Sequence, residues 1–427
     1  MDFGDFWWQG WLAAAVGWRP TGTTCRFTLL VEHEKLKAMD QGEGQVNRQS
    51  KGNQTDLMGS ADSTASMDLS ALPAAVTDRL EQYFNSRDAE VSAIGEHYRR
   101  VVAQLRQFTL GGGKRIRPLY AWLGWHVGGG PQGRYTDAED PEAVFSVACA
   151  LELIQACALI HDDIIDASNT RRGAPTVHRV FTELHAENEW AGSSEHFGQA
   201  VGILAGDVAL SWADDLIFDA GLSATALKRL HAPWRAMRTE VLGGQLLDIT
   251  AEASRDSRLE TAQSVNLYKT AAYTIARPLH IGAALAGMPA GETEKLLQYG
   301  WNFGCAFQLR DDLLGVFGDP AVTGKPAGDD LREGKRTVLL NTAIDYWQDK
   351  DPAAAEQLNL RVGVATSTAE INELAELIRT SGAIEHIEAE IDRLTAAGTA
   401  AIADLDTEDH YRELLLDLGQ RATKRVN

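Results

Sequence analysis

The stretch LIHDDIIDASNTRRG, residues 159–173, sets three acidic side chains against two arginines on an otherwise apolar segment. Asp162 and Asp166 are four residues apart, so on a helix both carboxylates project from one face, one turn apart. Asp163 lies beside them. Neighbouring carboxylates repel each other, and burying one without a partner is costly. The segment therefore predicts a positively charged partner at this point.

A second acidic pair, Asp311 and Asp312, lies near the end of another apolar segment, in FQLRDD. Carboxylate oxygens suit a hard cation, and Mg²⁺ keeps several waters and needs only a few protein ligands. A solvated helix end explains one acidic pair, but it explains poorly two such pairs on apolar helices. The predicted metal-binding residues are Asp162, Asp163, Asp166, Asp311 and Asp312.

Basic residues accompany both acidic clusters. GGGKRIRP, residues 111–118, places Lys114 and Arg117 behind a glycine loop whose backbone can approach an anion closely. The other candidates are Arg171 and Arg172 in TRRG, Lys269 beside the hydroxyl of Thr270, and Lys325 and Lys335 in GKPAGDDLREGK. Carboxylates that bind Mg²⁺, combined with several lysines and arginines, suit a diphosphate. Its oxygens share the metal while the basic groups neutralise the remaining charge.

The segments that carry these residues are helical in pattern. From about residue 70 onward, apolar residues recur at spacings of three and four, which predicts helices. The predicted helices span residues 68–91, 141–163, 198–221, 232–253, 264–287, 293–319 and 368–405. No segment shows the sustained alternation and hairpin turns of a β-sheet. Several segments are apolar around most of their circumference, so we expect them inside an all-α bundle.

Composition narrows the class of partner and compartment. The chain has 427 residues, 44% of them hydrophobic, and a net charge of −20, which argues against nucleic acid as the main partner. The four cysteines, Cys25, Cys149, Cys157 and Cys305, show no CxxC spacing. We interpret them as structural thiols in a reducing, cytoplasmic compartment.

The N-terminal region differs from the rest, and we expect residues 1–68 to be a poorly ordered extension and polar linker ahead of a domain at 69–427. Residues 6–18, FWWQGWLAAAVGW, are too few to span a bilayer, and no basic region precedes them as in a secretory signal. Two alternatives stay open: an interfacial anchor, and upstream sequence translated ahead of a later start at Met58 or Met67. We expect no stable membrane insertion.

Six motifs together resemble one known family. GGGKRIRP, DDIID, RRG, KT, FQLRDD and GKPAGDDLREGK, in this order, resemble the trans-isoprenyl diphosphate synthases from about residue 75 to the C-terminus. The resemblance implies the isoprenoid synthase fold, a single large helical bundle around a central cavity. It also implies Mg²⁺ as the cofactor, isopentenyl diphosphate and allylic diphosphates as substrates, and a homodimer.

The same resemblance assigns roles to individual residues. Asp162, Asp166 and Asp311 would hold Mg²⁺, supported by Asp163 and Asp312. Arg171, Lys269, Lys325 and Lys335 would bind diphosphate, and Thr270 and Gln308 would stabilise an allylic carbocation. Isopentenyl diphosphate would lie on Lys114, Arg117, Gln155 and Arg172. The released diphosphate would take the proton, so no protein base is needed, and His161 is expected to orient the aspartates.

Two positions depart from the family pattern. Many members carry histidine where this chain has Gln155, and the third aspartate of the second acidic motif is replaced by Gly315. Glutamine still donates a hydrogen bond, so the first change concerns affinity for isopentenyl diphosphate. The first aspartate of the second motif carries most of the metal contact, so the second change does not predict an inactive enzyme.

Product length depends on the residues below the first acidic motif. Cys157 and Ala158 lie about 6–7.5 Å below Asp162 on a helix, and both are small. Helical spacing places Ala158 on the face of Asp162 and turns Cys157 away from it. An open floor favours products beyond fifteen carbons, and Trp212 is a candidate to stop growth near twenty. Geranylgeranyl diphosphate is therefore the expected product, with a longer polyprenyl diphosphate as the alternative.

Three other functions fit the sequence less well than a prenyl diphosphate synthase. A terpene cyclase would share the fold but lack the isopentenyl site around Lys114 and Arg117. A phosphohydrolase of the HD type would need further histidine ligands, which the sequence does not pair convincingly with HDD. A noncatalytic partner subunit of another synthase is disfavoured because the five predicted metal-binding aspartates are intact.

Overall fold

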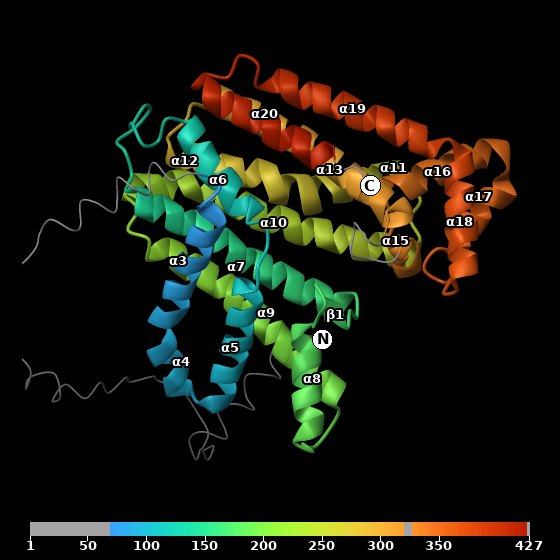
Figure 1. Cartoon of the computed structure of the whole chain (residues 1–427), viewed down its shortest axis with the longest axis horizontal. Coiled ribbons are helices and arrows are strands. Elements are labelled where there is room, and N and C mark those ends of the chain that lie inside the picture. The colour runs from blue at the N-terminus through green and yellow to red at the C-terminus, as the bar shows by residue number, and fades with distance from the viewer. Residues whose placement is uncertain (1–68, 320–326, 425–427) are drawn as a thin grey trace, which may run out of the picture. The chain divides into compact units, whose positions relative to one another are not determined.

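The computed structural model describes residues 69–319 and 327–424, and these residues belong to one compact unit, Thr55–Asn427. The expected N-terminal extension, Cys25 and Lys325 lie outside the described residues. Helices dominate the described part of the chain (Figure 1), which confirms the predicted all-α class.

The described helices follow one another in two halves of the chain. The first half contains α3 (Leu72–Ser86), α4 (Asp88–Ile94), α5 (Glu96–Leu110), α6 (Ile116–Val127), α7 (Pro141–Ile165), α8 (Val177–Glu187), α9 (Ser194–Phe218) and α10 (Ala224–Ser254). The second half contains α11 (Leu259–Val265), the π-helix η1 (Asn266–Ala276), α12 (Arg277–Leu285), α13 (Ala290–Phe317), α15 (Asp329–Glu333), α16 (Val338–Lys350), α17 (Pro352–Arg361), α18 (Thr368–Ser381), α19 (Ala383–Ala401) and α20 (Asp409–Thr423).

Helix α7 is the centre of the largest hydrophobic cluster. It packs against α9 and α6, and most of its side chains are buried. It begins at Pro141, after Asp140 accepts a hydrogen bond from the backbone N–H of Glu142, as expected for a capped helix start. Among the described helices, α7 alone is long and apolar enough to cross a membrane by length and composition, but 83% of that window is buried inside the protein.

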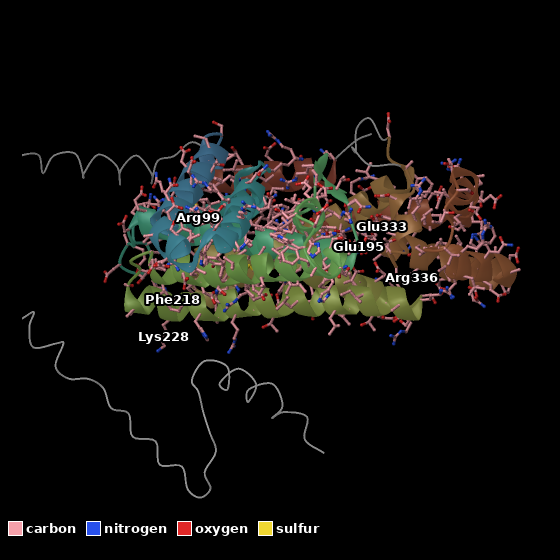
Figure 2. The ribbon with its side chains drawn as sticks, turned by 90° about the horizontal axis from the view of Figure 1, so that it is seen from below. Arg99, Glu195, Phe218, Lys228, Glu333 and Arg336 are labelled. Carbon is pink, nitrogen blue, oxygen red and sulfur yellow. The ribbon has the colours of Figure 1, made fainter. Side chains whose placement is uncertain are left out.

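Helix α9 is one of the long helices. In Figure 2, Glu195 near its start and Phe218 at its end lie far apart. Glu333 and Arg336 lie toward the same end as Glu195, whereas Lys228, near the start of α10, lies with Phe218. Helices α16, α17 and α18 gather at one end of Figure 1 around a second hydrophobic cluster.

The boundaries differ from the predicted ones where backbone conformation changes. The predicted helix 68–91 is divided at Arg87, and 368–405 is divided at Gly382, whose φ of 95° ends α18 in a left-handed conformation. Helix α10 begins earlier than predicted, because Ser223 caps it through the N–H of Ala226, and it continues through Pro233. Contrary to expectation, a short hairpin is present, with strands β1 (Thr170–Arg171) and β2 (Ala174–Pro175).

The predicted helix 264–287 contains a π-helical segment. The chain winds as α11, then as η1 over Asn266–Ala276, and then as α12. π-Helical turns are rare and frequently mark functional sites. Lys269 and Thr270, which the sequence singled out, both lie on η1.

Candidate active site

A cavity of about 430 Å³ lies between α6, α7, α10, η1, α13 and α15. Asp162 from α7 and Asp311 from α13 both line it, so the two acidic motifs converge on one space. The predicted residues that line this cavity are Arg117, Gln155, Ala158, Asp162, Lys269, Thr270, Gln308, Asp311, Asp312 and Lys335.

The first acidic motif occupies the last turn of α7. Asp163 is buried, and its Oδ1 accepts a hydrogen bond of 2.7 Å from Nε of Arg171. Arg171 also approaches Oδ2 of Asp162 at 3.5 Å. Arg171 supplies the positive partner that the sequence predicted beside the aspartates.

Lys269 lies between carboxylates from two helices. Its Nζ is 2.6 Å from Oδ2 of Asp248 on α10 and 3.6 Å from Oδ1 of Asp162. Burial lowers the pKa of Lys269, but Asp248 and Asp162 outweigh burial and hold that pKa above its usual value. The ammonium group is therefore charged and directed into the cavity.

Gly244 sets the close approach of α10 to η1. A Cβ built on Gly244 would lie 2.5 Å from the backbone N of Lys269, which real side chains do not allow. Only glycine permits the two helices to approach this closely. The backbone that carries Lys269 is thus held near Asp248, which lies one turn after Gly244 on α10.

Thr270, Gln308 and Asp312 form a chain of hydrogen bonds. The hydroxyl of Thr270 donates to Oε1 of Gln308 at 2.8 Å, and Nε2 of Gln308 donates to Oδ1 of Asp312 at 2.8 Å. Burial, together with the charges of Asp330 and Asp311, raises the pKa of Asp312 well above its usual range. Asp312 thereby fixes the amide orientation of Gln308 and leaves its oxygen toward Thr270.

A second polar group surrounds Tyr273 on η1. Its hydroxyl donates to Oε1 of Gln155 at 2.8 Å, and the guanidinium of Arg117 lies 4.0 Å from its ring centroid. Arg117 also donates to the hydroxyl of Thr274 at 3.1 Å. A cation–π contact therefore holds Arg117 on the ring of Tyr273, and a hydrogen bond holds Gln155 at the hydroxyl of the same residue.

The glycine loop before α6 contacts the hairpin that follows α7. Arg172 donates to the carbonyl oxygen of Gly112 at 2.9 Å. Lys114 lines a separate cavity of about 240 Å³, together with Arg421 from α20. Lys114 and Arg117 thus line two different cavities, and Arg172 is not among the described residues that line either of them.

The donor set fits a divalent cation shared with a ligand. Oδ2 of Asp163 and Oδ2 of Asp312 are buried and have no hydrogen-bond partner among the described residues. Desolvation and the charge of Asp162 raise the pKa of Asp166 to about 6, and desolvation and Asp248 raise that of Glu252 to about 7. A cation between them would relieve this repulsion.

No three Asp, Glu, His or Cys side chains in the described ranges are close enough to hold a metal ion by themselves. Mg²⁺ does not require three clustered protein ligands. It is usually bound through one or two carboxylates and takes its remaining ligands from water and substrate phosphates. The arrangement therefore favours a cation held jointly by the aspartates and a diphosphate.

Asp163, Asp166, Arg171 and Arg172, although predicted, are not among the described residues that line this cavity. Three further predicted residues lie elsewhere. Cys157 is not among the described residues that line the cavity, because it lies one position from Ala158 and turns about 100° away. Trp212 is also absent from that lining and packs on Tyr83 and Phe84 in the hydrophobic cluster. The expectation that His161 orients the aspartates is wrong, since its Nε2 pairs with the carbonyl of Ile203 at 3.0 Å.

The sequence prediction missed several residues of the site. Gln245, Asp248, Tyr273 and Asp330 all line the cavity. Gln245 donates from Nε2 to Oδ1 of Asp162 at 3.1 Å. Gln245, Asp248 and Glu252 recur at helical spacing in GGQLLDITAE, and this polar stripe is the signal that could have found two of them.

The chain is similar in sequence to a family of known proteins. The family model described as polyprenyl synthetase matches residues 99–379. The (2E,6E)-farnesyl diphosphate synthase of Mycobacterium tuberculosis is 32% identical over 314 residues, covering 73% of this chain and 80% of that protein. The geranylfarnesyl diphosphate synthase of Aeropyrum pernix is 35% identical over 283 residues, covering 65% of this chain and 79% of that protein.

The chain is also similar to solved structures of prenyl synthases. The geranylgeranyl pyrophosphate synthase from Corynebacterium glutamicum, complexed with isoprenyl diphosphate and magnesium, superposes with a TM-score of 0.80. It is 53% identical and covers 84% of this chain and 100% of its own. The polyprenyl synthase from Caulobacter crescentus, complexed with calcium and isoprenyl diphosphate, has a TM-score of 0.65 and 28% identity, covering 86% of this chain and 98% of its own.

Proposed function

We propose a reaction for this chain from the premise that it belongs to the polyprenyl synthetase family and is a prenyltransferase. It condenses isopentenyl diphosphate head to tail with allylic diphosphates and makes geranylgeranyl diphosphate. The observation that carries the proposal is the single cavity on which Asp162 and Asp311 converge, with Lys269 and Lys335 beside them. Two acidic helix segments and two ammonium groups around one space suit a diphosphate head.

Mg²⁺ is the proposed cofactor, held by Asp162, Asp166 and Asp311, and when bound it would neutralise charge on the departing diphosphate. Lys269 and Lys335 would bind oxygens of the same diphosphate, with Arg171 and Lys325 as further candidates. These cations stabilise the negative charge that develops as the allylic C–O bond breaks. Lys335 is suited to this role because Asp330 and Glu333 outweigh burial and raise its pKa.

Formation of the carbocation and of the new C–C bond is proposed to depend on other polar groups that line the cavity. Breaking the C–O bond leaves an allylic carbocation, which the oxygens of Thr270 and Gln308 would stabilise. The double bond of isopentenyl diphosphate, bound by Arg117 and Gln155 with Lys114 and Arg172, attacks that cation and forms the new C–C bond. A proton then leaves the adjacent carbon, and the released diphosphate accepts it.

The proposed product length depends on the size of the side chain below the first acidic motif. Ala158 lines the cavity one turn before Asp162, so no bulky side chain at that position blocks a growing chain. The similarity to a geranylgeranyl pyrophosphate synthase at 53% identity supports a twenty-carbon product. Trp212 packs on Tyr83 and Phe84 and is not among the described residues that line the cavity, but it stays a proposed limit to further growth.

The test is product chromatography. The purified full chain is incubated with isopentenyl diphosphate, Mg²⁺ and dimethylallyl, geranyl or farnesyl diphosphate, and the dephosphorylated products are separated by length. We expect the twenty-carbon alcohol from each primer, and Ala158→Phe is expected to stop at fifteen carbons or fewer, whereas Ala158→Ser keeps twenty. Products longer than twenty carbons would favour the polyprenyl alternative, and no elongation would contradict the proposal.

A homodimer in the cytoplasm is part of the proposal. Leu242 and Leu246, four residues apart on α10, are exposed by 61% and 65%. Contiguous apolar side chains exposed on one face can mark a contact between subunits. Light scattering should give twice the mass of the chain, and Leu246→Glu should shift it toward the monomer.

A further inference from the structure

Gly315 lies where the family's second acidic motif has its third aspartate, four residues after Asp311 on α13. It is therefore on the same helix face as Asp311. A Cβ built on Gly315 would overlap Oδ2 and Cγ of Asp330. The carboxylate of Asp330 thus already occupies the space directly beside the Gly315 backbone.

Asp330 reaches this space from a different element. It lies in α15, whose start is set by Gly328 with a φ of 75°. Nζ of Lys335 lies 3.8 Å from Oδ1 of Asp330, and the N–H of Lys335 donates to the carbonyl of Asp330 at 3.0 Å. These contacts hold Asp330 against the segment that follows α15, and α15 itself packs against α13. Glu333 and Arg336 mark this region in Figure 2.

The space beside Asp330 also contains a buried acceptor. Asp312 is 2% exposed and lines the same cavity as Asp311 and Asp330, and its Oδ2 has no hydrogen-bond partner within the described ranges. A buried carboxylate oxygen without a donor is costly. A cation or its bound water in this part of the cavity would satisfy it.

We propose that Asp330 supplies the third carboxylate of the second acidic site, and that Gly315 is present because it leaves room for that carboxylate. Asp330 and Asp311 would then hold one divalent cation together, with Asp312 accepting from its hydration shell. The acidic motif is completed from α15 instead of from α13. This inference rests on the proposed function only for the identity of the cation.

Cation binding tests the proposal independently of turnover. The full chain is titrated with Mn²⁺ in the presence of inorganic diphosphate, and bound Mn²⁺ is measured by electron paramagnetic resonance against a protein-free blank. We expect Asp330→Asn to weaken Mn²⁺ binding about tenfold, the size of effect seen when a metal site loses a supporting carboxylate. Asp329→Asn changes the neighbouring carboxylate, which does not line the cavity, and should leave binding within about twofold of wild type.

A second pair of variants keeps Asp330 intact. Gly315→Ala adds only a methyl group, which displaces the Asp330 carboxylate, and should weaken Mn²⁺ binding to a similar extent. Gly291→Ala makes the same change on the same helix, where no described atom lies within 4 Å of the new Cβ, and should have no effect. Circular dichroism identifies any variant that fails to fold, and Gly315→Ala then decides the question if Asp330→Asn does not fold.

Wild-type affinity for Mn²⁺ in a folded Asp330→Asn or Gly315→Ala variant would overturn the inference. The proposed function fails separately, if the wild-type chain makes no prenyl product. A wild-type chain that elongates prenyl chains, with variants that bind Mn²⁺ normally, would leave the function standing and remove Asp330 from the metal site. Weakened Mn²⁺ binding in the variants, together with a wild-type chain that makes no prenyl product, would support the role of Asp330 and contradict the proposed function.

Discussion

At the scale of single residues, the site depends on charges that meet only when the chain is folded. Lys269 contacts Asp248 and Asp162, which come from α10 and α7. Arg171 bridges Asp163 and Asp162. Asp162, Asp163 and Asp248 therefore each have a basic partner. A diphosphate with its cation would compete for these partners.

Asp162→Asn should reduce turnover at least about 10²-fold, because the amide neither holds a cation nor pairs with Lys269, and developing charge on the diphosphate loses its stabilisation. The measurement is kcat under saturating substrates and Mg²⁺. Asp345→Asn, an exposed position on α16, is the matched control and should be unchanged. A variant at position 162 with near-normal kcat would refute the metal-binding role of Asp162.

Tyr273→Phe should raise KM for isopentenyl diphosphate up to about tenfold while kcat changes little. The variant removes the hydrogen bond to Gln155 but keeps the ring under Arg117, so about 1 kcal/mol of positioning is lost. Tyr268→Phe on the same π-helix, where the side chain is 39% exposed, is the control. Equal effects of the two substitutions would show that Tyr273 has no special role.

At the scale of elements, the approach of α10 to η1 positions Lys269, the proposed diphosphate-binding lysine. The π-helix places Lys269, Thr270 and Tyr273 along one cavity wall, and Gly244 lets α10 lie against the backbone of Lys269. The same packing at α13 leaves Gln308 facing Thr270. The relative position of these three helices is therefore the main structural requirement of the site.

Gly244→Ala should lower both stability and kcat, because the added methyl group forces α10 from η1. Overpacking of this kind costs about 1–3 kcal/mol. Gly243→Ala is the adjacent control, since a Cβ there meets no described atom within 4 Å, and it should be neutral or slightly stabilising. Thermal unfolding and initial rates measure the two effects, and equal behaviour of the two variants would contradict the close-approach explanation.

At the scale of the whole molecule, a buried ion pair connects the glycine loop before α6 to the core. Arg115, at the start of α6, donates to Glu152 of α7 and to the carbonyl of Thr109 at 2.9 Å. The two charged side chains are only 2% and 8% exposed. This pair fixes the glycine loop, with Lys114, to the central helix of the bundle.

Glu152→Gln should lower the free energy of unfolding by about 3–5 kcal/mol, because it leaves the Arg115 charge buried without a counterion. Denaturant unfolding measures the change. Glu390→Gln breaks the Glu390–Arg393 pair, in which the arginine is 63% exposed, and should cost less than about 1 kcal/mol. A loss of the same small size in both variants would show that the buried pair contributes nothing special to stability.

The sequence alone determined the class of fold, the helical segments and the acidic and basic motifs, because helical periodicity and short motifs are local properties of the chain. Only the tertiary structure decided which charges meet. It paired Lys269 with Asp248, placed Tyr273 on Gln155, turned His161 toward Ile203 and brought Asp330 beside Gly315. These contacts depend on the packing of distant helices and on the winding of η1, neither of which is encoded in local spacing.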